Sequence, residues 1–100
     1  MPGAILTFVH EPDDLDEIMS CRPAFKKFAP HLWIWKSPLG NVSVRGQWLS
    51  IGGYELCIYT ADGSHAPQAR ANRLALDLHK HYSECSTLKW IVDGLTYLAD

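Results

Sequence analysis

The sequence predicts an α+β protein in which an antiparallel sheet packs against helices. Residues 31–60 alternate between apolar and polar side chains and contain two tight-turn signals, which indicates three consecutive strands. Residues 12–22 and 64–84 repeat apolar side chains at helical spacing. The expected order is β-α-β-β-β-α-α, with a sheet of three to four strands in one domain that covers residues 1–100, because a chain of this length suits a single core.

The N-terminal part predicts one strand followed by one helix. Residues 4–10 read AILTFVH, and β-branched and aromatic residues of this kind favour a strand. Pro12 suits the first turn of a helix over residues 12–22, which Pro23 would end. Negative charge is favourable near the N-terminus of a helix. The carboxylates gathered there are Glu11, Asp13, Asp14, Asp16 and Glu17.

Two turn signals divide the central stretch into strands 31–37, 42–50 and 54–60. The first is the sequence PLGN at residues 38–41, and the second is Gly52-Gly53, which favours a two-residue hairpin. Gly46 lies inside the second strand and indicates a bulge or a close backbone approach. Residues 22–30 are expected to form a connector that leads into these strands.

The C-terminal part predicts two helices. Ser64 is a candidate N-cap for the helix at 64–84. Residues 87–99 form a second amphipathic pattern, and we expect a helix there. A strand at 88–92 is the competing prediction, because β-branched and aromatic residues occupy its end. The apolar positions at helical spacing are Leu88, Ile91, Val92, Leu95 and Leu98.

Alternation along the three central strands predicts two different sheet faces. An aliphatic face is expected to lie under the helices, and it comprises Leu32, Ile34, Val42, Val44, Leu56 and Ile58. A mixed aromatic and polar face is expected on the other side, and it comprises Trp33, Trp35, Arg45, Gln47, Glu55 and Tyr59. Interfaces are enriched in Trp, Tyr and Arg. We therefore predict partner contacts at Trp33, Trp35, Arg45 and Tyr59; the alternative is that a helix covers the tryptophans as core.

Composition narrows the location and the type of partner. The formal net charge is −2, which argues against nucleic acid as the main ligand. Three widely spaced cysteines do not form a disulfide framework and fit free thiols in the cytoplasm. The N-terminus does not resemble a signal peptide, and no apolar run approaches the about 20 residues of a membrane span. We expect a cytoplasmic protein that does not cross a membrane.

Catalytic and metal-binding patterns are weak. His81 and Cys85 lie four residues apart, as two ligands on one helix face would, and Cys57 could join them in space. Structural zinc sites usually need two such pairs, so an ordinary helix end explains this pair better. The cysteines and histidines lack a nucleophile signature, and buried cysteines are usually inert. We therefore expect no catalytic residue, no metal, no cofactor and no enzymatic activity.

These observations favour a small protein-binding domain that acts as an inhibitor, adaptor or accessory subunit by docking on a partner protein. Its size and character suit an inhibitor of a host system encoded by a phage or mobile element. The five N-terminal carboxylates offer a second contact patch, because a compact charged patch steers a basic partner. If the aromatic face is exposed in the monomer, a homodimer could bury it.

Nucleic-acid binding is the alternative function. The order α-β-β-β-α is similar to that of double-stranded-RNA-binding domains, and the stretch from Gly63 to Ala75 resembles the start of their last helix. In those domains a lysine cluster grips phosphates, whereas this chain has HAPQ at residues 65–68. On this alternative the aromatic face would stack bases. Phosphates would then be contacted by Arg45, Arg70, Arg73 and Lys80.

Overall fold

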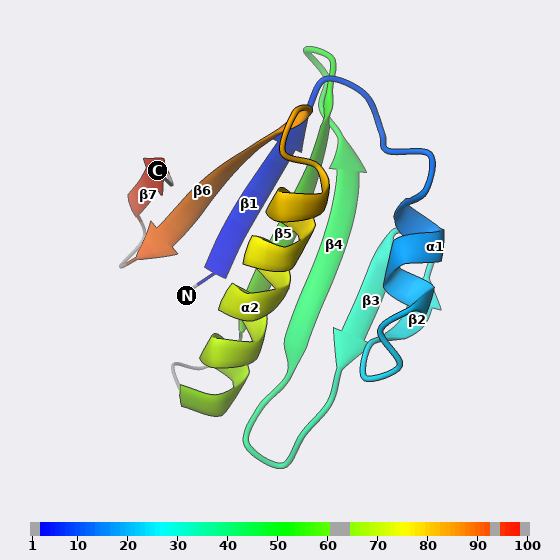
Figure 1. Ribbon diagram of the computed structural model, residues 1–100. Coiled ribbons are helices and arrows are strands. Elements are labelled where there is room, and N and C mark those ends of the chain that lie inside the picture. Colours follow the sequence, from blue (N-terminus) through cyan, green and yellow to red (C-terminus); the bar gives the residue numbers. More distant parts are fainter. Residues whose placement is uncertain (1–2, 61–64, 93–94, 99–100) are drawn as a thin grey trace.

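The computed structural model describes residues 3–60, 65–92 and 95–98. These residues form one antiparallel sheet with the strand order β2-β3-β4-β5-β1-β6-β7 and two helices (Figure 1). The strands are β1 (Gly3–Phe8), β2 (Lys26–Ala29), β3 (Leu32–Trp35), β4 (Val42–Trp48), β5 (Tyr54–Thr60), β6 (Ser86–Val92) and β7 (Leu95–Leu98). The helices are α1 (Leu15–Ser20) and α2 (His65–His81).

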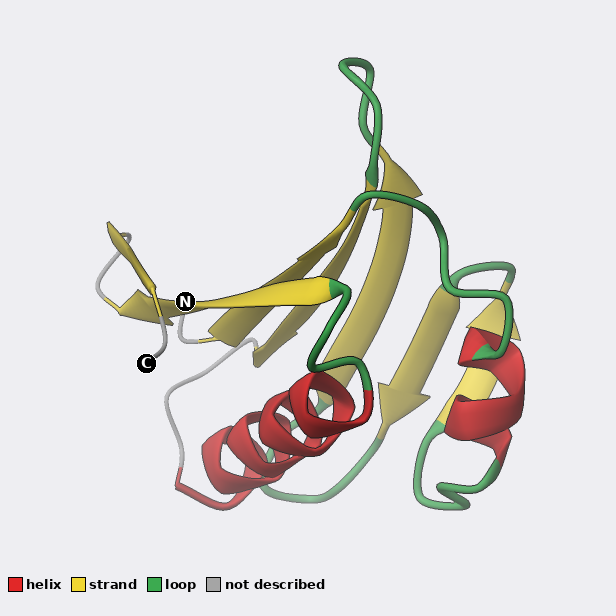
Figure 2. Cartoon of the chain, turned by 45° about the horizontal axis from the view of Figure 1, so that its top comes forward, coloured by secondary structure: helices red, strands yellow, loops and turns green. Residues whose placement is uncertain are grey.

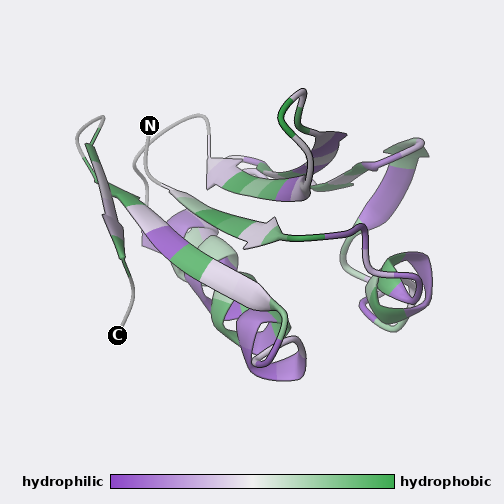
Figure 3. Ribbon diagram, turned by 90° about the horizontal axis from the view of Figure 1, so that it is seen from above, coloured by the Kyte–Doolittle hydropathy of each residue, from purple (hydrophilic) through white to green (hydrophobic). Residues whose placement is uncertain are grey.

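Both helices lie on the same, concave side of the sheet (Figures 2 and 3). Helix α2 packs across β1, β4, β5 and β6, and its buried stripe includes Leu74 and Leu78. Apolar residues at this helical spacing face the strands, so burying them drives the two layers together. Helix α1 lies near β2 and β3 and adds Leu15 and Met19 to the same core (Figure 1).

The predicted α+β class and the three central strands are confirmed. Strands β3, β4 and β5 are consecutive, adjacent and antiparallel. The predicted N-terminal strand is also present as β1, which lies between β5 and β6 and buries Ala4, Leu6 and Phe8. It is paired on both sides, because its apolar composition suits the middle of the sheet better than an edge.

The prediction of a helix at 87–99 is wrong for the residues that the structure describes. Residues 87–92 belong to β6 and residues 95–98 form β7, which pairs antiparallel with β6, while β6 pairs with β1 in a register that places Leu88 opposite Leu6. The strand preference of Trp90, Ile91 and Val92 agrees with this result. The pairing also satisfies the backbone groups along the second side of β1, which a helix would have left without partners. The sheet therefore has seven strands, against the expected three to four.

Three local predictions change in detail. The connector at 22–30 contains the edge strand β2, and the first helix is only six residues long. The second hairpin loop spans residues 49–53, longer than the predicted two residues, and Leu49 N donates to Gly53 O at 3.0 Å. Gly52 and Gly53 have φ angles of 98° and 100°, the left-handed region that favours glycine. The predicted N-cap, Ser64, lies outside the described residues.

In each central strand the predicted sets of residues do share a face. For β3, however, the two sets lie on the opposite sides of the sheet from those predicted. Trp33 is opposite Val44 and Trp35 is opposite Val42, and directly opposed residues share a face. Both tryptophans therefore point toward the helices, and Trp33 is only 3% exposed. Leu32 lies on the other face, opposite Arg45. The alternative in which the tryptophans belong to the core describes Trp33 correctly.

Candidate functional site

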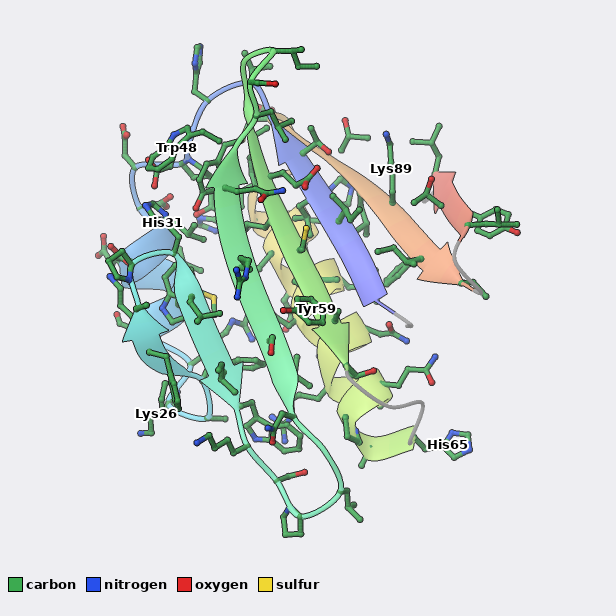
Figure 4. The ribbon with its side chains drawn as sticks, turned by 180° about the vertical axis from the view of Figure 1, so that it is seen from behind. Lys26, His31, Trp48, Tyr59, His65 and Lys89 are labelled. Carbon is green, nitrogen blue, oxygen red and sulfur yellow. The ribbon has the colours of Figure 1, made fainter. Side chains whose placement is uncertain are left out.

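The most extensive candidate surface is the convex face of the sheet, which no described helix covers. We call it the open face, and Figure 4 views the molecule from that side. Apart from the buried Gly3, its strand residues are half-buried or exposed, in contrast to the buried residues under α2. Pairing and alternation place Ile5, Thr7, Lys26, Leu32, Ile34, Ser43, Arg45, Gln47, Glu55, Cys57, Tyr59, Thr87, Lys89, Ile91, Thr96 and Leu98 on it.

Polar and aromatic groups gather near the middle of the open face. Tyr59 on β5 is opposite Ser43, and the next pair on this face is Arg45 opposite Cys57. The Gln47 amide donates a hydrogen bond of 2.8 Å to Glu55, which fixes the Glu55 carboxylate along the sheet. Arg45 is exposed and Tyr59 is half-buried, so both can contact a partner. Figure 4 labels Tyr59 on this face.

The open face is basic although the whole chain is acidic. Three of its charged residues are cationic, namely Lys26, Arg45 and Lys89, and one is anionic, namely Glu55. The chain as a whole carries a formal net charge of −2. Since opposite charges attract across an interface, this face favours an acidic partner surface.

Cys57 on the open face does not offer a reactive thiolate. Burial, followed by the nearby Glu55 carboxylate, raises the pKa of the Cys57 thiol to about 12. The thiolate is the nucleophilic form, so Cys57 remains a protonated thiol at neutral pH. The two exposed cysteines, Cys21 and Cys85, lie outside the strands.

The predicted contact set is divided between the two sides of the sheet. Arg45 and Tyr59 stand on the open face, whereas Trp33 and Trp35 stand under the helices. The guanidinium of Arg70 lies 4.9 Å from the centre of the Trp35 ring, a cation–π contact between α2 and β3. The arrangement brings two of the four residues to one surface and assigns the other two to packing.

The N-terminal carboxylates are used mainly in internal contacts. Asp14 accepts a 2.7 Å hydrogen bond from the Tyr82 hydroxyl and lies 3.1 Å from His81 Nε2. Asp16 pairs with Lys27 at 2.9 Å. Glu11 lies beside His31. Three of the five carboxylates therefore connect α1, or the segment that precedes it, to other parts of the chain. The other two, Asp13 and Glu17, are exposed.

A second His–Tyr–carboxylate group, absent from the sequence prediction, surrounds His31. Its Nδ1 lies 2.8 Å from the Tyr54 hydroxyl and 3.3 Å from a Glu11 carboxylate oxygen. The exposed Trp48 ring packs edge-on against His31 with centroids 4.6 Å apart. His31 has φ of 61°, which is uncommon for a residue with a side chain. The one signal in the sequence was Gly46, whose missing side chain makes room for the Tyr54 ring.

These contacts shift the titration of three groups. The hydrogen bond from Tyr82, and then that from His81, lowers the pKa of Asp14. Burial, and then the Asp14 hydrogen bond, raises the pKa of Tyr82. Burial and the nearby Glu11 carboxylate raise the pKa of Tyr54. Asp14 occupies the N-cap position of α1 but makes no capping hydrogen bond, and its carboxylate instead accepts the hydrogen bond from Tyr82.

The described residues contain no group of three or more His, Cys, Asp and Glu side chains that could hold a metal ion. His81, whose spacing from Cys85 fits an ordinary helix end better than a metal site, contacts Asp14. The proposed phosphate contacts are also dispersed: Arg45 lies on the open face, whereas Arg70, Arg73 and Lys80 lie on α2. One nucleic-acid strand could not contact all four on a single surface.

No protein-family model matches the sequence, and searches of curated proteins and solved structures also give no match. None of the helices in the described part of the chain has the length and apolar character needed to cross a membrane. The fold and the site together define an α+β protein with one antiparallel seven-stranded sheet whose convex face is open.

Proposed function

We propose that this protein is a non-enzymatic binding domain that docks on an acidic surface of a partner protein through its open face. Such a domain would act as an inhibitor, adaptor or accessory subunit. A cytoplasmic location belongs to the same proposal and is supported by the free state of Cys21, Cys57 and Cys85.

The observation that carries the proposal is a wide sheet face with helices on only one side. Partly exposed apolar residues such as Ile5 and Ile34 alternate on it with Arg45 and Gln47. Protein interfaces commonly combine apolar contact area with polar hydrogen-bonding groups. The basic balance of the open face supports an acidic partner.

The test compares three versions of the tagged protein in a pull-down from the source cells, after nuclease treatment. The wild type is compared with the double variant Arg45→Glu/Tyr59→Ala. The control is Lys80→Glu, a charge reversal at an exposed position on α2, away from the open face. We expect a protein with an acidic surface to be enriched by the wild type and the control but not by the double variant.

Enrichment of the same proteins by the double variant would overturn the proposal. Circular dichroism of each variant checks that the fold is intact before the comparison is made. The pull-down is repeated without nuclease, and if proteins captured there are lost after nuclease treatment in all three versions, the ligand is nucleic acid instead. If a protein partner is identified, its affinity for the purified wild type should be measured at a series of salt concentrations. A basic open face predicts weaker binding at higher ionic strength.

A further inference from the structure

The two edges of the sheet differ in how they avoid pairing with other strands. Strand β2 carries Lys26 and Lys27, is followed by Pro30, and has a register irregularity between Lys27 and Ala29. Charged residues, proline and bulges are the features by which proteins block an exposed sheet edge. The β2 edge is therefore protected against additional strands.

The opposite edge, β7, is also only four residues long, but it carries no charged residue, proline or bulge. It reads LTYL, pairs with β6 without a register irregularity, and has no hydrogen-bonded neighbour on its outer side among the described residues. Leu95 is 60% exposed, Tyr97 51% and Leu98 67%. An exposed, uncharged and apolar edge strand leaves backbone donors and acceptors available for pairing with another strand.

We propose that β7 pairs antiparallel with β7 of a second copy of this chain, so that two sheets join into one. A second copy fits because β7 has no charged side chain, and the strand therefore meets its own copy without like-charge repulsion. Antiparallel pairing of β7 with its own copy is also compatible with two-fold symmetry, in which both subunits contribute the same surface to the interface. This proposal is independent of the open-face partner.

The side chains favour a register centred on Thr96. Thr96 lies on the open face and would face its own copy, whereas Leu95 and Tyr97 lie on the helix side and would face each other across the axis. Thr–Thr and aromatic–aliphatic pairs are favourable across antiparallel strands. Because paired residues share a face, this register places both copies of α2 on the same side of the joined sheet. The two open faces then form one continuous surface.

The first test measures molecular mass by light scattering over a dilution series from about 1 mM to about 1 µM, the range in which a small interface dissociates. We expect dimer at the concentrated end and monomer on dilution. Thr96→Lys should remove the dimer by placing two like charges opposite each other. Thr87→Lys is the matched control, because Thr87 is exposed on the same face but lies on the interior strand β6.

The second test uses cross-linking and does not depend on the folding of the lysine variant. In a Cys21→Ser/Cys85→Ser background, Thr96→Cys should form a covalent dimer under mild oxidation, whereas Thr87→Cys should not. A wild type that is monomeric over the whole series, a dimer that survives Thr96→Lys, or equal cross-linking by both cysteine variants would overturn the proposal. A dimer that is lost with Arg45→Glu but not with Thr96→Lys would place the contact on the open face and would also overturn it.

Discussion

The ring of Tyr54 occupies the space that a Cβ atom at position 46 would need. Gly46 and Tyr54 lie on neighbouring strands, β4 and β5, and Tyr54 leans diagonally over the glycine. Its hydroxyl then reaches His31 Nδ1 at 2.8 Å. The glycine thus has a packing role, and the β4–β5 register continues past it without a bulge. The sequence predicted a bulge or a close backbone approach at Gly46, whereas the group that lies against the glycine is a side chain.

Gly46→Ala should destabilise the fold because the new methyl group must displace the Tyr54 ring. Overpacking of this kind typically costs about 1–3 kcal/mol. Urea unfolding monitored by tryptophan fluorescence measures the free energy of unfolding. Ser43→Ala is the control, because Ser43 lies on the same strand but on the open face, and it should change stability by less than about 0.5 kcal/mol. An alanine variant at position 46 with wild-type stability would contradict the observed packing.

The sequence predicted which residues share a face within each strand, but not how neighbouring faces combine. Alternation places Trp33 with Trp35, and Leu32 with Ile34, without reference to any other strand. Which pair faces the helices depends on the β3–β4 register, which joins Trp33 to Val44. Grouping residues by aliphatic character therefore placed Leu32 and Ile34 under the helices. The side chains of β3 that face the helices are instead Trp33 and Trp35.

Trp33→Ala should therefore be strongly destabilising instead of selectively removing partner binding. Trp33 is 3% exposed within the core, and truncating a buried aromatic residue costs about 3–5 kcal/mol. Trp48→Ala is the comparison, because Trp48 is 61% exposed and loses mainly its ring contacts with His31 and Tyr54, worth about 1 kcal/mol each. Urea unfolding of both variants checks the order. Equal losses of stability would contradict the assignment of Trp33 to the core.

The pattern of residues 87–99 could not separate helix from strand by itself. Leu88, Ile91 and Leu95 fit helical spacing, but Leu88 also faces Leu6 when β6 is paired with β1. The strand is favoured because the second side of β1 needs a partner for its backbone hydrogen bonds. This need arises from residues far away in the sequence, so the pattern of residues 87–99 alone does not contain it. The His31 and Asp14 contacts were missed for the same reason, since Tyr54 and Tyr82 are 23 and 68 residues away from them.

The three cysteines should react at different rates with a thiol reagent at neutral pH. Cys21 and Cys85 are exposed, whereas the pKa of Cys57 is raised to about 12 by burial and by Glu55. Because the thiolate is the reacting form, two thiols should be modified rapidly and one slowly. All three should react rapidly in denaturing urea. Mass spectrometry of the modified peptides identifies each site, and rapid native labelling of Cys57 would contradict its environment.

Glu55→Gln tests whether the Glu55 carboxylate contributes to the raised pKa of Cys57. The substitution removes the carboxylate charge that disfavours the Cys57 thiolate, while the amide can still pair with Gln47. Labelling of Cys57 should become faster, although burial is the larger cause and remains in place. Cys21 and Cys85 serve as internal controls whose rates should not change.

Asp14 should contribute stability that disappears at low pH. Its pKa in the folded protein lies below the ordinary value of 3.8, because the carboxylate accepts hydrogen bonds from Tyr82 and His81. A carboxyl group whose pKa is lowered by folding stabilises the protein above its unfolded pKa. That contribution is lost as the pH falls through the lower, folded value. Since the side chain is 42% exposed, solvent screening limits the contribution to about 1 kcal/mol or less.

Asp14→Asn removes the titrating group, so the difference in unfolding free energy between wild type and variant should narrow from about pH 5 to about pH 2. Thermal or urea unfolding at a series of pH values measures this difference. The control is Asp13→Asn, which removes a neighbouring charge that contacts neither Tyr82 nor His81 and is exposed. If the two variants show the same pH profile, the hydrogen bonds to Asp14 do not stabilise the fold, and the segment before α1 is held by its apolar contacts through Leu15.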